Sequence, residues 1–426
     1  MKTMKIRNFI IALAVLLPVS VSAQTVYSIV TNPAEDTSSA MRISWASDVP
    51  GTYVVVRPAD GRNTSPWNVH PEKEETCTVY DGNPSRMANG TNYNESAVFL
   101  KCGATLTSLK KDTEYIYNIC SSDGRRISED HRFKTSGARK WSCTVISDFH
   151  SYTPIPARLA SASALEATIR NFDPSTDWIL HLGDVTAWGG SYSFWKTMYA
   201  EPMFSGAMVA GLNGNHDNMT RTNGQSGDFF RYANYLPDNG YGDQKGICYH
   251  FMYSDVLFIM LNNETMKTDE ELTAAQDWVR KVIFDQKASG HKPSFIVVCE
   301  HYQWFYGKDG AFSQFSRWNK LFDELGVDLA LGANNHIYVR SNPIKDGRAV
   351  GAKKGTVYLQ TSSADNERGE EMDEAVSQNA DLIASRWTEG AKTISGLDMK
   401  VTPKKITLYL IDRHGNVQDD VVIPRK

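Results

Sequence analysis

The first third of the chain consists of short segments in which apolar and polar residues alternate. Aromatic and β-branched side chains are frequent in these segments, which lie at 41–45, 52–56, 97–100 and 114–119 with turn residues between them. Alternation with a period of two is typical of strands that bury one face, and several short strands at this spacing indicate a β-sandwich. We therefore expect an all-β sandwich over residues 24–137.

From residue 138 the pattern changes to mainly apolar runs that alternate with helical segments. Six apolar runs have the length of buried strands, at 142–146, 178–182, 207–212, 256–261, 295–298 and 328–331. Two segments place their apolar residues on one helical face, at 272–283 and 312–325. This alternation predicts an α/β (α+β) domain over 138–426, with layered β-sheets flanked by helices.

Residues 1–23 have the composition of a signal peptide. Three cations precede an apolar run at 9–19, and small residues follow it at 21–23. An uncleaved membrane anchor is the alternative, but the run is short for a spanning helix and no later segment reaches about 18 uninterrupted apolar residues. We expect a secreted or periplasmic protein that does not span the membrane.

The overall composition is that of a globular chain with a small negative charge. Hydrophobic residues make up 41% of the 426 residues and charged residues 22%, which leaves enough apolar surface for two packed cores. The formal net charge is -4, and loss of the three cations in the leader would make it -7. A negative chain does not attract nucleic acid through its net charge, so we expect no specific nucleic-acid binding.

All six cysteines follow residue 23, in the part of the chain that would reach an oxidising compartment. None has the CxxC spacing of a zinc site, and four of them lie between residues 77 and 143. Disulfides persist outside the cytosol, so we expect one or two bridges among these four.

Five short polar signals follow apolar runs of the second region, each at the point where a predicted strand ends. They contain Asp148 and His150, Asp184, Asn215 and His216, His301, and His336. Ligands collect at the carboxyl ends of strands in α/β sheets, because the loops converge there on a rigid scaffold. Between about 31 and 86 residues separate successive signals, which is enough for a crossover each time. We expect these side chains to form one site.

The order of these signals resembles the calcineurin-like metallophosphoesterase superfamily, whose motifs are DxH, GD, GNH followed by Asp or Glu, a His after a strand, and GHxH. The corresponding residues are 148–150, 183–184, 214–217, His301 and His336, and the resemblance covers about residues 141–363. The β-rich front and the sequence HIYVR at 336–340 are similar more narrowly to the purple acid phosphatases, which carry a fibronectin-like N-terminal domain.

The resemblance implies two divalent or trivalent metal ions, of iron, zinc or manganese. The first would be held by Asp148, His150, Asp184 and His336. The second would share Asp184 and add Asn215 and His301. A hydroxide bridging the two ions would attack phosphorus, with Asp184 and His216 as the catalytic residues. His216, which is not a ligand in the family, would bind the phosphate or protonate the leaving oxygen.

Three further positions decide how closely the chain follows these families. Ala187 stands where the purple enzymes have a metal-binding Tyr, so the colour of those enzymes is not expected. Asn334 stands in place of the first His of GHxH. As a weaker and harder ligand it would loosen the second metal site or favour manganese or magnesium there, unless it only shapes the turn. Arg340 would bind phosphate through its fork of donors or form a structural ion pair.

Several other residues have structural interpretations. His181 and His250 lie in predicted strands and are expected to pack there. The aromatic residues at 302 and 304–306 are expected to pack within their loop, with the lining of the cleft as the alternative. The acidic stretch at 365–381 is expected to be a solvated surface segment, with a lid over the site as the alternative.

Together these features predict an exported dimetal phosphoesterase that hydrolyses phosphate mono- or diesters, in a small molecule or a phosphorylated polymer. A nucleotide phosphodiesterase is the alternative within the same chemistry. A metal- or phosphate-binding module with little turnover is the alternative from another class, and Asn334 is the reason to consider it. The N-terminal sandwich offers no catalytic cluster, so we expect a spacer or an interaction domain.

Overall fold

The computed structural model of the chain describes residues 25–61, 65–81, 95–218, 228–290, 292–305, 314–366, 379–390 and 392–426. The predicted signal peptide at 1–23 lies outside the described residues, as do Tyr306 and residues 367–378 of the acidic stretch. Of the helices in the part of the chain that the structure describes, none has the length and apolar character that a membrane-spanning helix needs.

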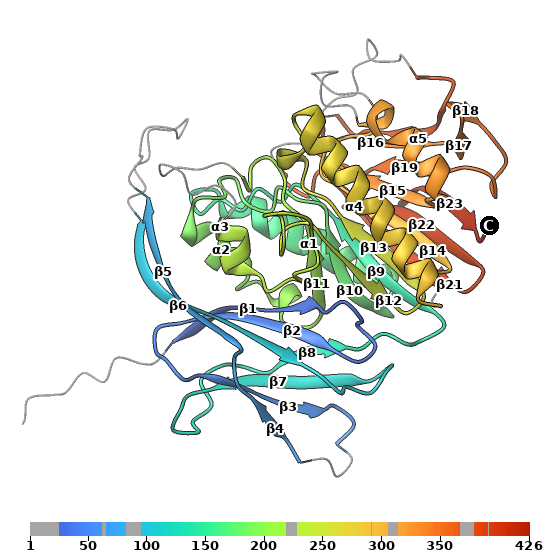
Figure 1. Cartoon of the computed structure of the whole chain (residues 1–426). Helices are drawn as coiled ribbons and strands as arrows, with labels where there is room; N and C mark the ends of the chain where they lie inside the picture. The colour runs from blue at the N-terminus through green and yellow to red at the C-terminus, as the bar shows by residue number, and fades with distance from the viewer. Residues whose placement is uncertain are drawn as a thin grey trace, which may run out of the picture.

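The first third of the chain forms two packed layers of strands (Figure 1). One layer contains β1 (Val26–Pro33), β2 (Met41–Ser47), β6 (Glu95–Leu106) and β5 (Lys73–Asp81). The other contains β4 (Trp67–Val69), β3 (Tyr53–Pro58), β7 (Glu114–Cys120) and β8 (His131–Lys134). The hydroxyl of Thr31 in β1 donates to that of Tyr117 in β7 across the layers, at 2.9 Å. The all-β front that the alternating pattern predicts is confirmed.

The first of these layers continues into the rest of the chain. β1 pairs in parallel with β11 (Met208–Gly211), with Thr31 opposite Met208. The result is a ten-stranded sheet in the order β23-β22-β21-β9-β10-β11-β1-β2-β6-β5. Its remaining strands are β9 (Trp141–Ile146), β10 (Thr176–His181), β21 (Ser395–Thr402), β22 (Lys405–Asp412) and β23 (Val417–Pro424). β1 therefore pairs with an edge of β11 that would otherwise be open.

A second sheet of seven strands packs against the ten-stranded sheet, in the order β12-β13-β14-β15-β19-β16-β20. Its strands are β12 (Tyr249–Tyr253), β13 (Val256–Met260), β14 (Phe295–Cys299), β15 (Leu329–Gly332), β19 (Val357–Gln360), β16 (Tyr338–Ser341) and β20 (Ile383–Trp387). Aromatic rings fill the space between the two sheets. The ring of Trp178 in β10 lies 5.2 Å from the rings of Tyr253 and Phe258. A short hairpin of β17 (Ile344–Lys345) and β18 (Arg348–Ala349) follows β16.

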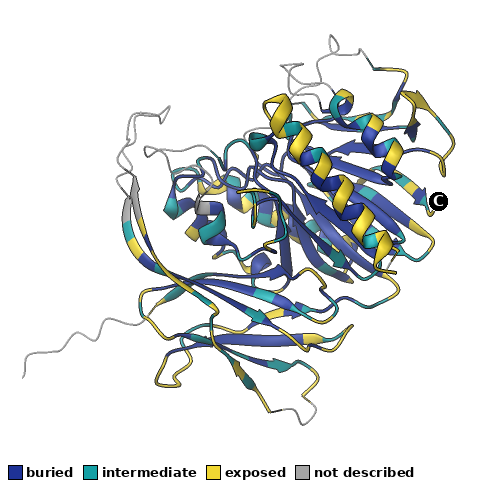
Figure 2. Ribbon diagram, viewed as in Figure 1, coloured by how far each residue is buried: buried dark blue, intermediate teal, exposed yellow. Residues whose placement is uncertain are grey.

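Helices pack on the outer faces of the sheets. α1 (Pro156–Phe172) contacts β9 and β21, whereas α4 (Asp269–Ala288) and α5 (Phe315–Leu325) share a core with the second sheet. Figure 2 shows α4 with its exposed side turned outward. A capping box between Thr268 and Glu271 begins this helix. The other helical segments are α2 (Tyr192–Met198), η2 (Pro202–Phe204), α3 (Asp228–Ala233) and η3 (Asn263–Thr265). The predicted layered sheets with flanking helices are confirmed.

The expected disulfides do not form, because all six cysteines are buried free thiols. In the pairing of β5 with β6, Cys77 lies opposite Phe99 and Cys102 lies opposite Glu74. Cys102 is three positions from Phe99, so its side chain points to the opposite face of the sheet from that of Cys77. The expectation of one or two bridges between residues 77 and 143 is therefore wrong.

An ion pair joins the second sheet to the last strand of the first. Arg340 of β16 donates through Nε (2.6 Å) and Nη2 (3.0 Å) to the carboxylate of Asp419 in β23, and the hydroxyl of Tyr338 donates to it at 2.7 Å. The side chains of Arg340 and Asp419 are each 13% exposed, so water screens the pair poorly. Burial would raise the pKa of Asp419, but the hydrogen bonds from Arg340 and Tyr338 hold it below its ordinary value.

We expect Asp419→Asn to lower the free energy of unfolding by about 2 kcal/mol, because a charged acceptor of hydrogen bonds is lost. Because the pKa of Asp419 is lowered in the folded chain, its contribution is complete above the ordinary aspartate pKa of about 4 and is lost as the pH falls through the folded-state pKa. Urea unfolding at neutral and acidic pH measures the difference. Asp420→Asn, at the exposed neighbouring position, is the control. Equal losses in both variants would contradict the expectation.

Candidate metal centre

The five polar signals meet beyond the carboxyl ends of strands from both sheets. The loops after β9, β10 and β11 of the ten-stranded sheet carry the first three signals. The loops after β14 and β15 of the second sheet carry the other two. The strands are parallel within each set, so their carboxyl ends lie at the same edge. Packing of one sheet on the other then brings the two sets of loops together.

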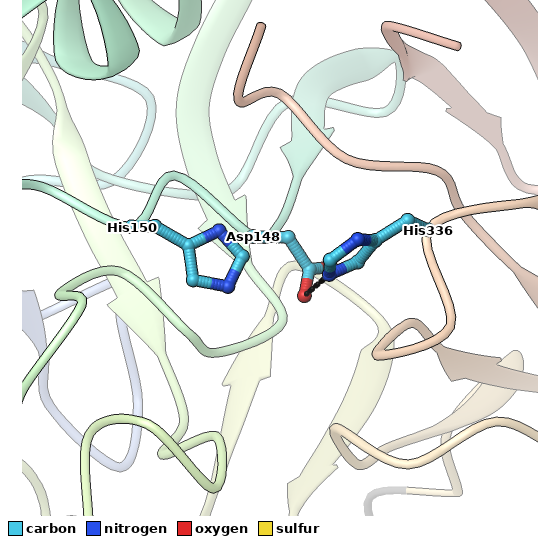
Figure 3. A group of neighbouring side chains, drawn as sticks. All are labelled: Asp148, His150 and His336. Carbon is cyan, nitrogen blue, oxygen red and sulfur yellow. Dashed lines mark ion pairs between the residues drawn. The ribbon is translucent and has the colours of Figure 1, made fainter. Parts of the chain in front are cut away.

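Asp148, His150 and His336 form the first group of side chains in this centre (Figure 3). All three are buried, and each offers a ligand atom within 4.8 Å of the others. Nε2 of His336 lies 3.3 Å from Oδ1 of Asp148. The two carboxylate oxygens of Asp148 accept no hydrogen bond within the described part of the chain. A carboxylate buried in this way is costly unless a cation compensates its charge.

Asp184 lies between this group and a second one, which contains His301 and Asn215. Its Oδ2 is 3.4 Å from Nε2 of His150 and 3.3 Å from Nε2 of His301. Its Oδ1 accepts a hydrogen bond from the backbone N–H of His216 at 2.8 Å. The amide oxygen of Asn215 lies 3.1 Å from Nε2 of His301. One carboxylate therefore faces histidines of both groups, as a ligand shared by two metal ions must.

The charges in the two groups favour a cation at their centre. Burial would raise the pKa of Asp184, but His301 and His216 hold it well below its ordinary value. Burial would lower the pKa of His301, but Asp184 and Asp148 raise it to about 10. A metal ion that binds here displaces the proton of His301. Carboxylate oxygens and imidazole nitrogens are ligands of zinc, iron and manganese, so the residues fit the expected ions.

Backbone carbonyl groups set the orientation of two histidine rings. Nδ1 of His301 lies 2.7 Å from the carbonyl oxygen of Leu182, and Nδ1 of His216 lies 2.9 Å from that of Ala187. A carbonyl oxygen only accepts hydrogen bonds, so each Nδ1 carries a proton and donates it. Nε2 of each ring is then the nitrogen that ligates a metal ion or exchanges a proton.

The backbone of the ligand loops is strained. Ten non-glycine residues in the described chain have a positive φ, and five of them belong to this centre: Asp148, His150, Asp184, Asn334 and His336. Side chains disfavour this conformation, so the surrounding structure must impose it, as is common at functional sites. A glycine allows the closest approach of two loops, because a Cβ on Gly214 would collide with the carboxylate of Asp184.

Asp365 adds a carboxylate to the first group, a position that its acidic sequence context did not predict. Its Oδ2 lies 3.3 Å from Nδ1 of His150 and 3.5 Å from Nε of Arg158. A carboxylate on the far nitrogen of a ligating histidine orients the ring toward the metal. Asp365 is fully buried, so the expectation of a solvated surface is wrong at this position. The useful signal was its place just after β19, which runs parallel to β15.

Asn334, which departs from the GHxH pattern, lies half-buried between β15 and β16 with a φ of 70°. Its Nδ2 donates a hydrogen bond of 2.6 Å to Oε1 of Gln303, which is itself buried. This contact holds the amide group in one orientation. Whether the amide oxygen ligates the second metal stays a prediction.

Three other residues singled out in the sequence have structural contacts, an ion pair for Arg340 and packing for His181 and His250. Arg340 is engaged by the carboxylate of Asp419. His181 is enclosed in β10 against the backbone of β11, and burial lowers its pKa to about 3, so the ring is neutral. The ring of His250 packs on Trp278 of α4, with 6.2 Å between the ring centroids.

The described aromatic residues after His301 pack inside the protein. Trp304 and Phe305 are buried in the core that the second sheet shares with α5. The rings around them belong to Phe315, Phe322 and Tyr358. Tyr302 is buried as well, and its hydroxyl donates to the carboxylate of Glu264. Loop packing, and not the lining of a cleft, accounts for these three residues.

The part of the chain that carries the motifs matches a known family. Residues 142–338 match the family model described as calcineurin-like phosphoesterase. The structure is similar to purple acid phosphatase PPD1 from yellow lupin (Lupinus luteus) seeds, with a TM-score of 0.72 and 16% identity over 95% of this chain and 75% of that chain. It is also similar to PhoD, with a TM-score of 0.58 and 11% identity over 95% of this chain and 90% of that chain. No curated protein matches the chain.

Residues 142–338 are therefore similar to the calcineurin-like phosphoesterases, and the resemblance drawn from the motifs is confirmed. The two solved structures share their fold with nearly the whole chain, the β-rich front included.

We expect Asp365→Asn to weaken Zn²⁺ binding by about 10- to 100-fold, because an amide holds the Nδ1 proton of His150 less firmly than a carboxylate does. Calorimetric titration of the metal-free protein with Zn²⁺ measures the change. Asp381→Asn, at the exposed end of the same acidic stretch, is the matched control and should bind as wild type does. Unchanged affinity in Asp365→Asn, with thermal unfolding also unchanged, would rule out the orienting role.

Proposed function

We propose that this chain is an exported phosphoesterase that hydrolyses phosphate mono- or diesters with two metal ions. The observation that carries the proposal is the buried carboxylate of Asp184, which faces Nε2 of both His150 and His301. Two groups of ligands that share a carboxylate are what a two-metal centre requires. The family match over 142–338 supports the same class of reaction. Export is inferred from the signal-like composition of residues 1–23.

The proposed ligands divide into two sets. The first metal would be held by Asp148, His150, Asp184 and His336. The second would be held by Asp184, Asn215 and His301, with the amide oxygen of Asn334 as a further ligand. Iron, zinc and manganese suit these donors. When bound, such ions supply hydroxide near neutral pH and neutralise charge on the phosphoryl oxygens.

His216 is the residue that we assign to proton transfer and phosphate binding. Its backbone N–H is fixed to Asp184 and its Nδ1 proton is donated to Ala187, so the ring is held on both sides. Protonated Nε2 then donates to the ester and passes its proton to the leaving oxygen as the bond from that oxygen to phosphorus breaks. The half-buried state of His216 leaves the ring accessible to a substrate.

The proposed substrate is a small phosphate ester or a phosphorylated group on a polymer. His216, Asn215 and Asn334 are all half-buried, which leaves one side of the centre open to such a group. A nucleotide phosphodiesterase is the alternative, and faster turnover of bis(4-nitrophenyl) phosphate than of 4-nitrophenyl phosphate would favour it. For the N-terminal sandwich we propose a spacer or interaction role.

We expect Asp184→Asn to abolish hydrolysis of 4-nitrophenyl phosphate nearly completely, because both groups lose a shared charged ligand. His216→Ala should lower kcat by about 100- to 10,000-fold through loss of the general acid. Initial rates of proteins loaded with zinc, manganese or iron measure both effects. His414→Ala, which removes an exposed histidine, is the control. Equal residual rates in wild type and both variants would favour a binding module with little turnover.

We expect Asn334→His to raise affinity for the second metal, because imidazole is a stronger ligand than an amide oxygen for zinc or iron. Metal content measured across a chelator titration reports the change, with the second ion retained to higher chelator concentration in the variant. Asn342→His, at another half-buried loop asparagine, is the matched control. The same stoichiometry in wild type and Asn334→His at every chelator concentration would show that Asn334 only shapes the turn.

A further inference from the structure

A small apolar cluster lies beside the metal centre, separate from the two main cores. Its members are Tyr152, Ile155, Ala187, Trp188 and Phe194. The cluster is built on the loops that carry the ligands, because Tyr152 follows His150 by two residues and Trp188 follows Asp184 by four. Ile155 and Trp188 form its half-buried edge, whereas the other members are buried.

The loop that carries Trp188 is fastened to His216. Nδ1 of His216 donates to the carbonyl oxygen of Ala187 (2.9 Å), and the backbone N–H of Gly189 donates to the carbonyl oxygen of His216 (2.8 Å). The indole N–H of Trp195 donates to the carbonyl oxygen of Gly189 at 2.8 Å. A Cβ on Gly189 would collide with the backbone that follows His216, so this approach requires glycine. The residues on both sides of Trp188 are therefore fixed relative to His216.

The indole of Trp188 meets the imidazole of His216 edge to face. The ring centroids lie 6.4 Å apart at an interplanar angle of 63°. Both residues are half-buried, whereas Asp184 and His301 behind them are buried. The indole therefore lines the side of the centre that solvent reaches. Behind it, the rings of Tyr152 and Phe194 pack edge to face at 5.2 Å within the same cluster.

We propose that Trp188 determines substrate specificity by binding the organic part of the leaving group, and that the preferred esters carry an aromatic or other apolar leaving group. The proposal rests on the proposed function. If His216 protonates the leaving oxygen, that oxygen lies within hydrogen-bond reach of His216. The group attached to it then lies against the indole of Trp188, which is fixed beside the same ring.

An apolar leaving group gains from this position in two ways. Contact with the indole removes apolar surface of both partners from water, and an aromatic ring adds a favourable stacked or edge-to-face geometry. A leaving group rich in hydroxyl groups gains neither, because an indole face offers no hydrogen bonds to replace those of water. The indole therefore makes binding affinity depend on the organic group of the ester, while the contacts to the phosphoryl group stay the same.

The test compares two phosphonates that cannot be hydrolysed. In benzylphosphonate and ethylphosphonate a CH₂ group replaces the ester oxygen of phenyl phosphate and methyl phosphate. Binding of each to the full chain reconstituted with Zn²⁺ is measured by calorimetry for wild type, Trp188→Ala and Trp188→Phe. Trp67→Ala, which truncates a half-buried indole in β4 far along the chain, is the matched control.

We expect Trp188→Ala to weaken benzylphosphonate by about 3- to 10-fold and ethylphosphonate by less than about twofold. Trp188→Phe keeps an aromatic face and should retain most of the preference, and Trp67→Ala should bind both compounds as wild type does. Equal weakening of both compounds, no weakening of either, or no binding of either to wild type would overturn the proposal. If Trp188→Ala unfolds at a much lower temperature than wild type, Trp188→Phe and Trp188→Leu are compared instead. Trp188→Leu should then lose more of the preference for benzylphosphonate over ethylphosphonate than Trp188→Phe does.

Turnover of phenyl phosphate and methyl phosphate by the same proteins separates this proposal from the proposed function. If the wild type binds benzylphosphonate through Trp188 but hydrolyses neither ester, Trp188 keeps its role in binding the organic group and the proposed hydrolase activity is lost. A wild type that hydrolyses both esters, with kcat/KM lowered equally for both by Trp188→Ala, keeps the hydrolase and loses the specificity assignment.

Discussion

The burial of two carboxylates at one point is the constraint on which the candidate metal centre depends. Asp148 and Asp184 lie out of water and close enough to share histidine neighbours, so their charges repel each other and are poorly solvated. Both residues also have a positive φ. Burial of two like charges on strained backbone costs free energy, so another interaction must stabilise it. A bound cation would stabilise both charges at once. The histidines around these two carboxylates also stabilise their negative charges.

Each sheet orients a proposed metal ligand that the other sheet carries. His150 belongs to a loop of the ten-stranded sheet, and its outer nitrogen faces Asp365 from a loop of the second sheet. His301 belongs to the second sheet, and its outer nitrogen donates to the carbonyl oxygen of Leu182 beside the first. Each ring is therefore oriented by the opposite sheet. The aromatic packing between the sheets, around Trp178, consequently affects the geometry of the centre although it lies away from it.

The sequence allowed most of the local structure and the convergence of the motif residues to be predicted, because both follow from short-range patterns. Apolar runs identify buried strands, and polar residues just after them, such as Asp184 and His301, fall at one sheet edge. Contacts set by tertiary packing were not accessible in this way. The acidic residues around Asp365 predict a surface segment, whereas the position of β19 beside β15 brings Asp365 next to His150. The number of cysteines predicted disulfides, but the strand register, which the sequence does not reveal, places Cys77 and Cys102 on opposite faces of the sheet.

The parallel pairing of β1 with β11 also bears on how the chain folds during synthesis. Thr31 leaves the ribosome long before Met208, its partner in the sheet. One edge of β1 therefore has no partner until the centre of the chain has been made, whereas β2, the antiparallel partner on its other edge, follows it closely in the sequence. An open edge of this kind invites pairing with the wrong strand or with another molecule. The front of the molecule, which looks like a separate module along the chain, therefore completes its sheet only after β11 has been made.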